Sequence, residues 1–293
     1  MKRSFLMMAV LVLCLGSACT STRAVRTLAL GCADSTAHAD FSMNIDFPLG
    51  GKGALEEIRN TVMDVVDSEL GFMASFEGGR VIPAYAGDAE DTDAWFRYYR
   101  NAGSNYLEQA ALEDVLDREA YILSDEDFTP EEKADMLSTI PRWEYDYQFE
   151  KLYETPRYVV FQSLAFVYLG GAHGGINGAG PLTIDKRSGA LLTDWFLPEA
   201  EDGMQDLLVD GLLGYFSDAD VELAREELLE HLFIEDGHIP LPAWNPMPTK
   251  EGLELTYQQY EIASYAEGMP SLTLPYKTVA PFLTPAAREL LKI

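Results

Sequence analysis

A single histidine set among four glycines is the part of this sequence best suited to chemistry. Residues 170–175 read Gly-Gly-Ala-His-Gly-Gly. Glycines let backbone N–H groups come close to a ligand, and the His173 imidazole could act as a general base or a metal ligand. A structural role fits as well, because a strand leaving a sheet needs torsions that glycine adopts at low cost, and one histidine can fasten the turn by hydrogen bonding. Of the three roles for this motif, we expect a structural one before a binding surface, and a binding surface before catalysis or metal binding.

No second motif completes a catalytic or metal site around His173. His231 and His238 lack the His-Glu-x-x-His spacing of helical zinc sites. The sequence also has no Gly-x-Ser-x-Gly elbow, no Cys-x-x-Cys pair and no dinucleotide-binding glycine fingerprint. We therefore predict no catalytic residue, no metal ligand and no cofactor. The 48 acidic residues leave a glycosidase-like acid pair neither assigned nor excluded.

A tyrosine-rich segment near the C-terminus is a second candidate surface. Exposed tyrosines anchor interfaces because their rings are large, rigid and amphipathic. The alternative is a corner of the core in which tyrosine hydroxyls bond to the backbone. Together with the glycine motif, the candidate binding residues are Gly170, Gly171, His173, Tyr257, Tyr260, Glu261, Tyr265 and Gly268.

The composition is that of a globular and strongly acidic protein. The chain has 293 residues, of which 47% are hydrophobic, and a formal net charge of −27. This charge argues against nucleic acid or an anionic membrane surface as a partner. The acidic charge could attract a cationic partner, or it could serve only to keep the protein soluble.

The N-terminus has the pattern of an exported lipoprotein. Lys2 and Arg3 precede the apolar run 5–15, which is too short to span a bilayer and is typical of an export signal. Small residues before Cys19 predict cleavage after Ala18 and lipid attachment to Cys19, with Cys32 as the alternative site. Removing residues 1–18 takes away two positive charges and no negative ones, which moves the net charge from −27 to −29. We expect a signal at 1–18, a tether at 19–39 and a location in the cell envelope, facing the periplasm or the exterior.

The periodicity of the remaining chain predicts an α+β fold with mixed, largely antiparallel sheets, packed helices and two α/β subdomains. Alternating patterns predict strands at 41–47, 143–148, 158–169, 253–257 and 271–276, and a hairpin formed by 182–184 and 190–196 around a turn at 185–189. Helical spacing predicts helices at 55–70, 106–119, 125–136, 204–216 and 221–233, the last capped by Ser217 or Asp218, and a short one after Thr284-Pro285.

Two blocks of this sequence resemble the domain of unknown function 3298 family. The first runs from Tyr168 through the glycine motif to 182–196, and the second contains Gly252-Leu253, residues 257–268 and Leu274-Pro275-Tyr276. Ser264 stands where the family usually has proline, and Gln258 where it often has asparagine. The preceding region is similar to the domain of unknown function 4163. We therefore expect a 4163-like domain at 40–165 and a 3298-like domain at 166–293, with the glycine motif as the hinge between them.

The resemblance implies a binding module and not a known reaction. This pair of domains occurs in the extracytoplasmic part of RsiV-type anti-sigma factors, which sense lysozyme, and beside the catalytic domain of some peptidoglycan deacetylases. The expected partner is a cationic, lysozyme-like protein or a peptidoglycan-type glycan, with membrane contact through the lipid only. The alternative is an envelope hydrolase or metal-dependent enzyme that acts on cell-wall glycan through His173.

Overall fold

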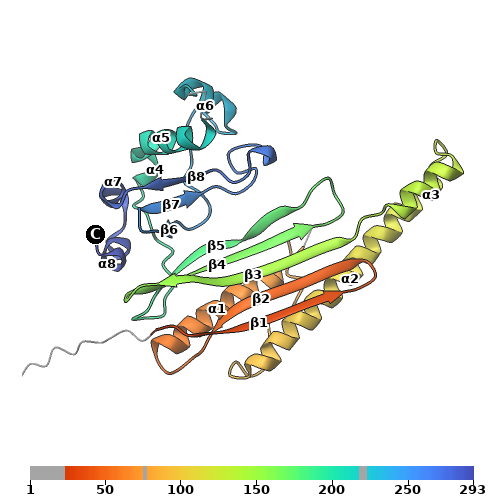
Figure 1. The fold of residues 1–293 in the computed structure, drawn as a ribbon, viewed down its shortest axis with the longest axis horizontal. Helices are drawn as coiled ribbons and strands as arrows, with labels where there is room; N and C mark the ends of the chain where they lie inside the picture. Colours follow the sequence, from red (N-terminus) through yellow and green to blue (C-terminus); the bar gives the residue numbers. More distant parts are fainter. Residues whose placement is uncertain (1–23, 75–77, 218–222) are drawn as a thin grey trace, which may run out of the picture.

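The computed structural model describes residues 24–74, 78–217 and 223–293, and within them the predicted α+β class is confirmed. A five-stranded sheet has the order β1-β2-β3-β4-β5 and a smaller sheet the order β6-β7-β8 (Figure 1). The large sheet consists of β1 (Thr27–Ser35), β2 (Ala39–Pro48), β3 (Trp143–Glu154), β4 (Tyr158–Tyr168) and β5 (Gly175–Asp185). All its neighbours are antiparallel except β2 and β3, which are parallel. The predicted signal peptide and Cys19 lie outside the described residues.

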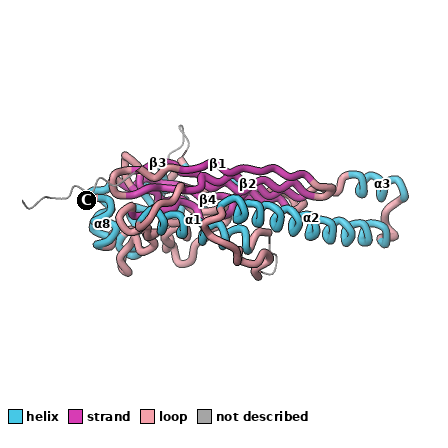
Figure 2. The backbone as a smooth tube through the Cα atoms, turned by 90° about the horizontal axis from the view of Figure 1, so that it is seen from below, coloured by secondary structure: helices cyan, strands magenta, loops and turns pink. Residues whose placement is uncertain are grey.

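Two long helices cover one face of the large sheet (Figures 1 and 2). They are α1 (Ala54–Gly71) and α2 (Thr92–Ser124), and α2 runs on beyond the strands to α3 (Pro130–Ser138). The alternating aromatic residues of β3 explain this arrangement, because Trp143, Tyr145, Tyr147 and Phe149 all point to the helices and are buried. No helix in the described ranges is long and apolar enough to cross a membrane.

Local sequence sets where these helices begin. The Asp91 side chain accepts a hydrogen bond from the Ala94 N–H at 2.9 Å and caps α2. Thr129 and Glu132 form a capping box at α3, with Pro130 in the first turn as predicted. Helix α2 is longer than the predicted 106–119, because its first turns bury Trp95 and Tyr99 against the sheet core.

The C-terminal unit has its own hydrophobic core and packs beside β5 (Figure 1). Its sheet contains β6 (Met247–Pro248), β7 (Leu253–Thr256) and β8 (Ser271–Leu274). Its helices are α4 (Ala200–Gly203), α5 (Gln205–Phe216), α6 (Arg225–His231), α7 (Tyr276–Val279) and α8 (Pro285–Leu291), with 3-10 turns η1 (Tyr265–Glu267) and η2 (Ala280–Phe282).

The structure differs from the sequence predictions at the N-terminus and after β5. Part of the predicted tether, Thr27–Ser35, is strand β1, which pairs with β2 along its full length. The predicted strand 190–196 makes only two isolated bridges, at Leu191 and Phe196, because the chain leaves the large sheet there. Helix α6 is shorter than the predicted 221–233 and is capped at Ala224, so the Ser217 cap is wrong; Asp218 lies outside the described residues.

The division into two units also differs from the predicted boundary at 165/166, which falls inside β4. Strand β5 belongs to the large sheet, and the first core still includes Leu191 while the second begins near Leu192 and Trp195. Residues 170–175 are therefore the tip of the β4–β5 hairpin. The chain passes from the first core to the second after β5, near Leu191 and Leu192.

Candidate functional site

The tip of the β4–β5 hairpin meets the loop between β7 and β8 at three exposed or partly exposed rings. The rings belong to His173 on the hairpin and to Tyr260 and Tyr265 on the loop. We call these three residues the ring cluster. Two of the segments that the sequence singled out separately are thus brought together by the fold.

The geometry of the ring cluster is a stack. The His173 and Tyr265 rings lie 3.7 Å apart between centroids with an interplanar angle of 20°. His173 Nε2 lies 3.1 Å from the Tyr260 hydroxyl, and Nδ1 lies 2.9 Å from the Gly174 carbonyl oxygen. Tyr260 remains 58% exposed. The stack therefore presents a preordered aromatic and hydrogen-bonding surface to solvent.

The backbone at both sides of the ring cluster is unusual. Tyr260 has φ +67°, a left-handed conformation that costs a non-glycine residue about 1 kcal/mol or more. Gly170 has φ +72° and lies against Arg118 of α2 and Pro141, which is why glycine suits this position. An exposed aromatic residue held in a strained conformation points to a role outside the folding of the chain.

Two residues that the sequence did not indicate hold the hairpin against the C-terminal unit. The Gln259 Oε1 accepts a hydrogen bond from the Ile176 N–H at 2.8 Å. The Trp244 indole N–H donates to the Gly178 carbonyl at 2.8 Å, and its ring lies against Gly180. Glycines inside a strand mark places where another group approaches the backbone closely. The predicted strand began only at 182, whereas β5 begins at Gly175, so this signal was missed.

The remaining candidate residues have structural surroundings. Tyr257 is fully buried, its hydroxyl donates to the Pro240 carbonyl at 2.8 Å, and burial raises the pKa of its phenol. The Glu261 carboxylate accepts from the N–H groups of Ala243 and Gln258, both at 2.7 Å. Gly268 has φ +74° and ends the η1 turn. These three residues position the loop that carries Tyr260 and Tyr265.

Gly171 is exposed at the hairpin tip, and an added Cβ there would have no atom within 4 Å. Neither ring nitrogen of His173 contacts a carboxylate in the described part of the chain. Within residues 24–74, 78–217 and 223–293, no group of three or more His, Cys, Asp or Glu side chains is placed to hold a metal ion. The arrangement offers stacking and hydrogen bonding.

Comparison with known proteins gives a family for part of the chain and a fold for nearly all of it. Residues 218–277 match the family model described as "Protein of unknown function (DUF3298)". The structure is similar to that of a DUF3298 family member from Bacteroides fragilis NCTC 9343, with a TM-score of 0.66, 18% identity, and coverage of 93% of this chain and 100% of that chain.

A DUF3298 family protein from Pseudomonas aeruginosa PAO1 matches with a TM-score of 0.49 and 16% identity over 91% of this chain and 97% of that one. No curated protein matches the sequence. The Bacteroides likeness concerns the fold alone, and the family match includes Tyr260 and Tyr265 but not His173. The chain thus carries a DUF3298 domain at residues 218–277 on a fold that a DUF3298 family structure shares along its whole length.

Proposed function

We propose that this chain is a non-enzymatic binding module of the cell envelope whose ligand-contacting surface includes the ring cluster. The observation that carries the proposal is the exposed stack of His173 on Tyr265, with Tyr260 hydrogen-bonded to it in a strained conformation. Aromatic side chains held in place before binding lose little conformational entropy in a complex, so they make effective interface anchors.

The proposed ligand is a cationic protein, of which a lysozyme-like protein is the type suggested by the resemblance to RsiV-type and 4163-like domains. A net charge of −27 favours such a partner, because it accelerates encounter with a positively charged surface. Glycan rings also stack on tyrosine, so a peptidoglycan-type glycan is the competing ligand that the experiment must separate.

The test measures binding of the mature chain, with Cys19→Ser in place of the lipid, to hen lysozyme and to soluble peptidoglycan fragments. We expect lysozyme to bind, and salt to weaken this binding by screening. His173→Ala and Tyr260→Ala should each weaken binding about tenfold or more, as expected for interface anchors. Leu28→Ala is the control, because Leu28 is a 44% exposed apolar residue on β1, the sheet edge opposite β5.

Three outcomes would count against the proposal in different ways. Binding of glycan but not of lysozyme, sensitive to Tyr260→Ala, would keep the ring cluster and replace the ligand. Binding that Leu28→Ala and Tyr260→Ala weaken equally would remove the ring cluster from the interface. Absence of binding to both probes would leave the binding role without support and make hydrolysis of cell-wall glycan the next activity to assay.

Envelope anchoring at Cys19 is part of the same proposal. The alternative, Cys32, lies within β1 opposite Met43 of β2, so attachment there would require cleavage inside a paired strand. In a bacterial host that processes lipoproteins, we expect palmitate labelling and membrane recovery to be lost in Cys19→Ala and kept in Cys32→Ala. The reverse result would move the anchor to Cys32.

A further inference from the structure

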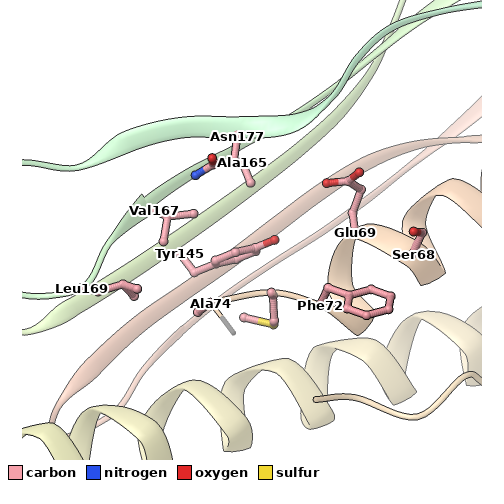
Figure 3. Close-up of a pocket in the computed structure, with 10 residues that line it drawn as sticks. Ser68, Glu69, Phe72, Ala74, Tyr145, Ala165, Val167, Leu169 and Asn177 are labelled. Carbon is pink, nitrogen blue, oxygen red and sulfur yellow. The ribbon is translucent and has the colours of Figure 1, made fainter. Parts of the chain in front are cut away.

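A cavity of about 410 Å³ lies between the C-terminal end of α1 and the helix-facing side of β3, β4 and β5 (Figure 3). It lies apart from the ring cluster, and the proposed function does not use it. Strands β3, β4 and β5 contribute Tyr145, Val167 and Asn177, and α1 contributes Glu69. The sheet and the helix thus form a concave wall that contains apolar, aromatic, amide and acidic side chains.

Glu69 is the feature that gives the cavity a preference. Its carboxyl extends from α1 toward the strands, and the Tyr145 hydroxyl points toward it (Figure 3). Burial raises the pKa of Glu69, and no cation or hydrogen-bond donor contacts it in the described ranges. None of the described residues that line the cavity is basic. A partly buried carboxylate without a counter-charge favours a cation that can enter.

The end of α1 adds to this preference. Glu69 lies in the last turn of an 18-residue helix that has no basic residue in that turn. Because the C-terminal end of a helix carries partial negative charge, a carboxylate there is disfavoured and a cation is attracted. The nearby Arg80 does not supply the missing charge, since it pairs with Asp67 at 2.7 Å and lies over the outer Phe72 ring.

The rest of the lining determines what kind of cation fits. Met73, Val167 and Leu169 provide apolar walls, and the Tyr145 ring suits a cation or a flat apolar group, whereas Arg80 already lies over the Phe72 ring. A hydrated metal ion would leave these apolar walls unused. We propose that the cavity binds a small organic ammonium compound, with its charged nitrogen at Glu69 and its apolar body against Tyr145, Val167 and Leu169.

The test compares amines with alcohols of the same shape, by calorimetry on the mature chain. The probes are 2-phenylethylamine against 2-phenylethanol and octylamine against octanol. We expect each amine to bind about 10- to 100-fold more tightly than its alcohol, the ratio typical of a charge-assisted hydrogen bond. Glu69→Gln should remove this preference while leaving alcohol binding unchanged. Asp64→Asn, which removes an exposed acid from the same helix, is the control for net charge and should keep the preference.

Amide chemical shifts locate the binding and complete the test. Shifts of Tyr145, Val167 and Asn177 on addition of either amine would support the site. Equal affinity for amine and alcohol, an amine preference that survives Glu69→Gln, or no saturable binding of any probe would each overturn the proposal. Circular dichroism checks that Glu69→Gln is folded. If it is not, Glu69→Asp replaces it in the test: this variant keeps the charge but shortens its reach, and it should bind the amines with intermediate affinity.

Discussion

Trp244 donates its indole N–H to the carbonyl oxygen of Gly178 across 2.8 Å, which ties the C-terminal unit to strand β5. The same ring covers Gly180, where φ is +69° and an added Cβ would come within 2.6 Å of the ring. We expect Gly180→Ala to destabilise the chain by about 2–4 kcal/mol, because overpacking and a left-handed alanine both cost free energy. Urea denaturation followed by near-ultraviolet circular dichroism measures this change in the free energy of unfolding.

The control for this prediction is the same change in a Trp244→Ala background. Removing the ring removes the clash and leaves only the backbone cost of about 1–2 kcal/mol. If Gly180→Ala costs the same in both backgrounds, Trp244 is not the group that requires glycine at this position.

A buried hydrogen bond between Tyr147 and Ser163 gives a second prediction. The two hydroxyl oxygens are 3.0 Å apart and both residues are fully buried. Ser163→Ala leaves the tyrosine hydroxyl without a partner, so it should destabilise the chain by about 1–3 kcal/mol. Adding Tyr147→Phe to Ser163→Ala should restore part of this loss in chemical denaturation. A double variant less stable than Ser163→Ala would contradict the account.

Glu69 predicts an unusual dependence of stability on pH. Its pKa is raised by burial in the folded state above the unfolded value of about 4.3, so the folded state binds the proton more tightly. The carboxylate therefore lowers stability at neutral pH, and this penalty disappears as pH falls below the unfolded value. Glu69→Gln should be more stable than the native chain at pH 7 and equal to it near pH 4, as measured by denaturant titration at both values. Asp64→Asn should show no such pattern.

The strained backbone of Tyr260 predicts that glycine is the more stable small residue at this position. With φ at +67°, Tyr260→Gly should be more stable than Tyr260→Ala by about 1 kcal/mol, because alanine keeps the steric cost of the left-handed conformation. Thermal unfolding of the two variants gives the comparison. Both should lose the same partner affinity, since both lose the ring, and unequal affinities would show that the backbone itself contacts the partner.

Much of the fold could be predicted because burial on one face leaves a clear period in the sequence. Helix α1 repeats its apolar residues at helical spacing and was predicted at 55–70, within one residue of its observed bounds. Strand β3 was predicted from its alternating aromatic and polar residues at 143–148, but it continues to Glu154, beyond the clear alternation. Strand β1 was missed for the opposite reason. As an edge strand of small residues it contains no fully buried position, and its sequence therefore has no strong alternation.

The candidate site was only partly visible in the sequence, since burial depends on distant contacts. Tyr257 and Tyr260 are three positions apart and look alike in sequence, yet one is fully buried and the other 58% exposed. Glu69 gave no signal either, because a single acid on an amphipathic helix is usually solvated. Its desolvation arises only when β3, β4 and β5 are assembled over the end of α1.

The parallel pairing of β2 with β3 fixes the order in which this chain can fold. Ser42 and Asp146 are neighbours in this pairing but 104 positions apart in the sequence. The β1–β2, β3–β4 and β4–β5 pairs each join strands that are consecutive in the sequence. The β2–β3 pair can form only after the three helices between these strands have been synthesised. During synthesis from the N-terminus, β2 therefore presents an unpaired edge until β3 emerges, and in that interval the chain is most exposed to aggregation.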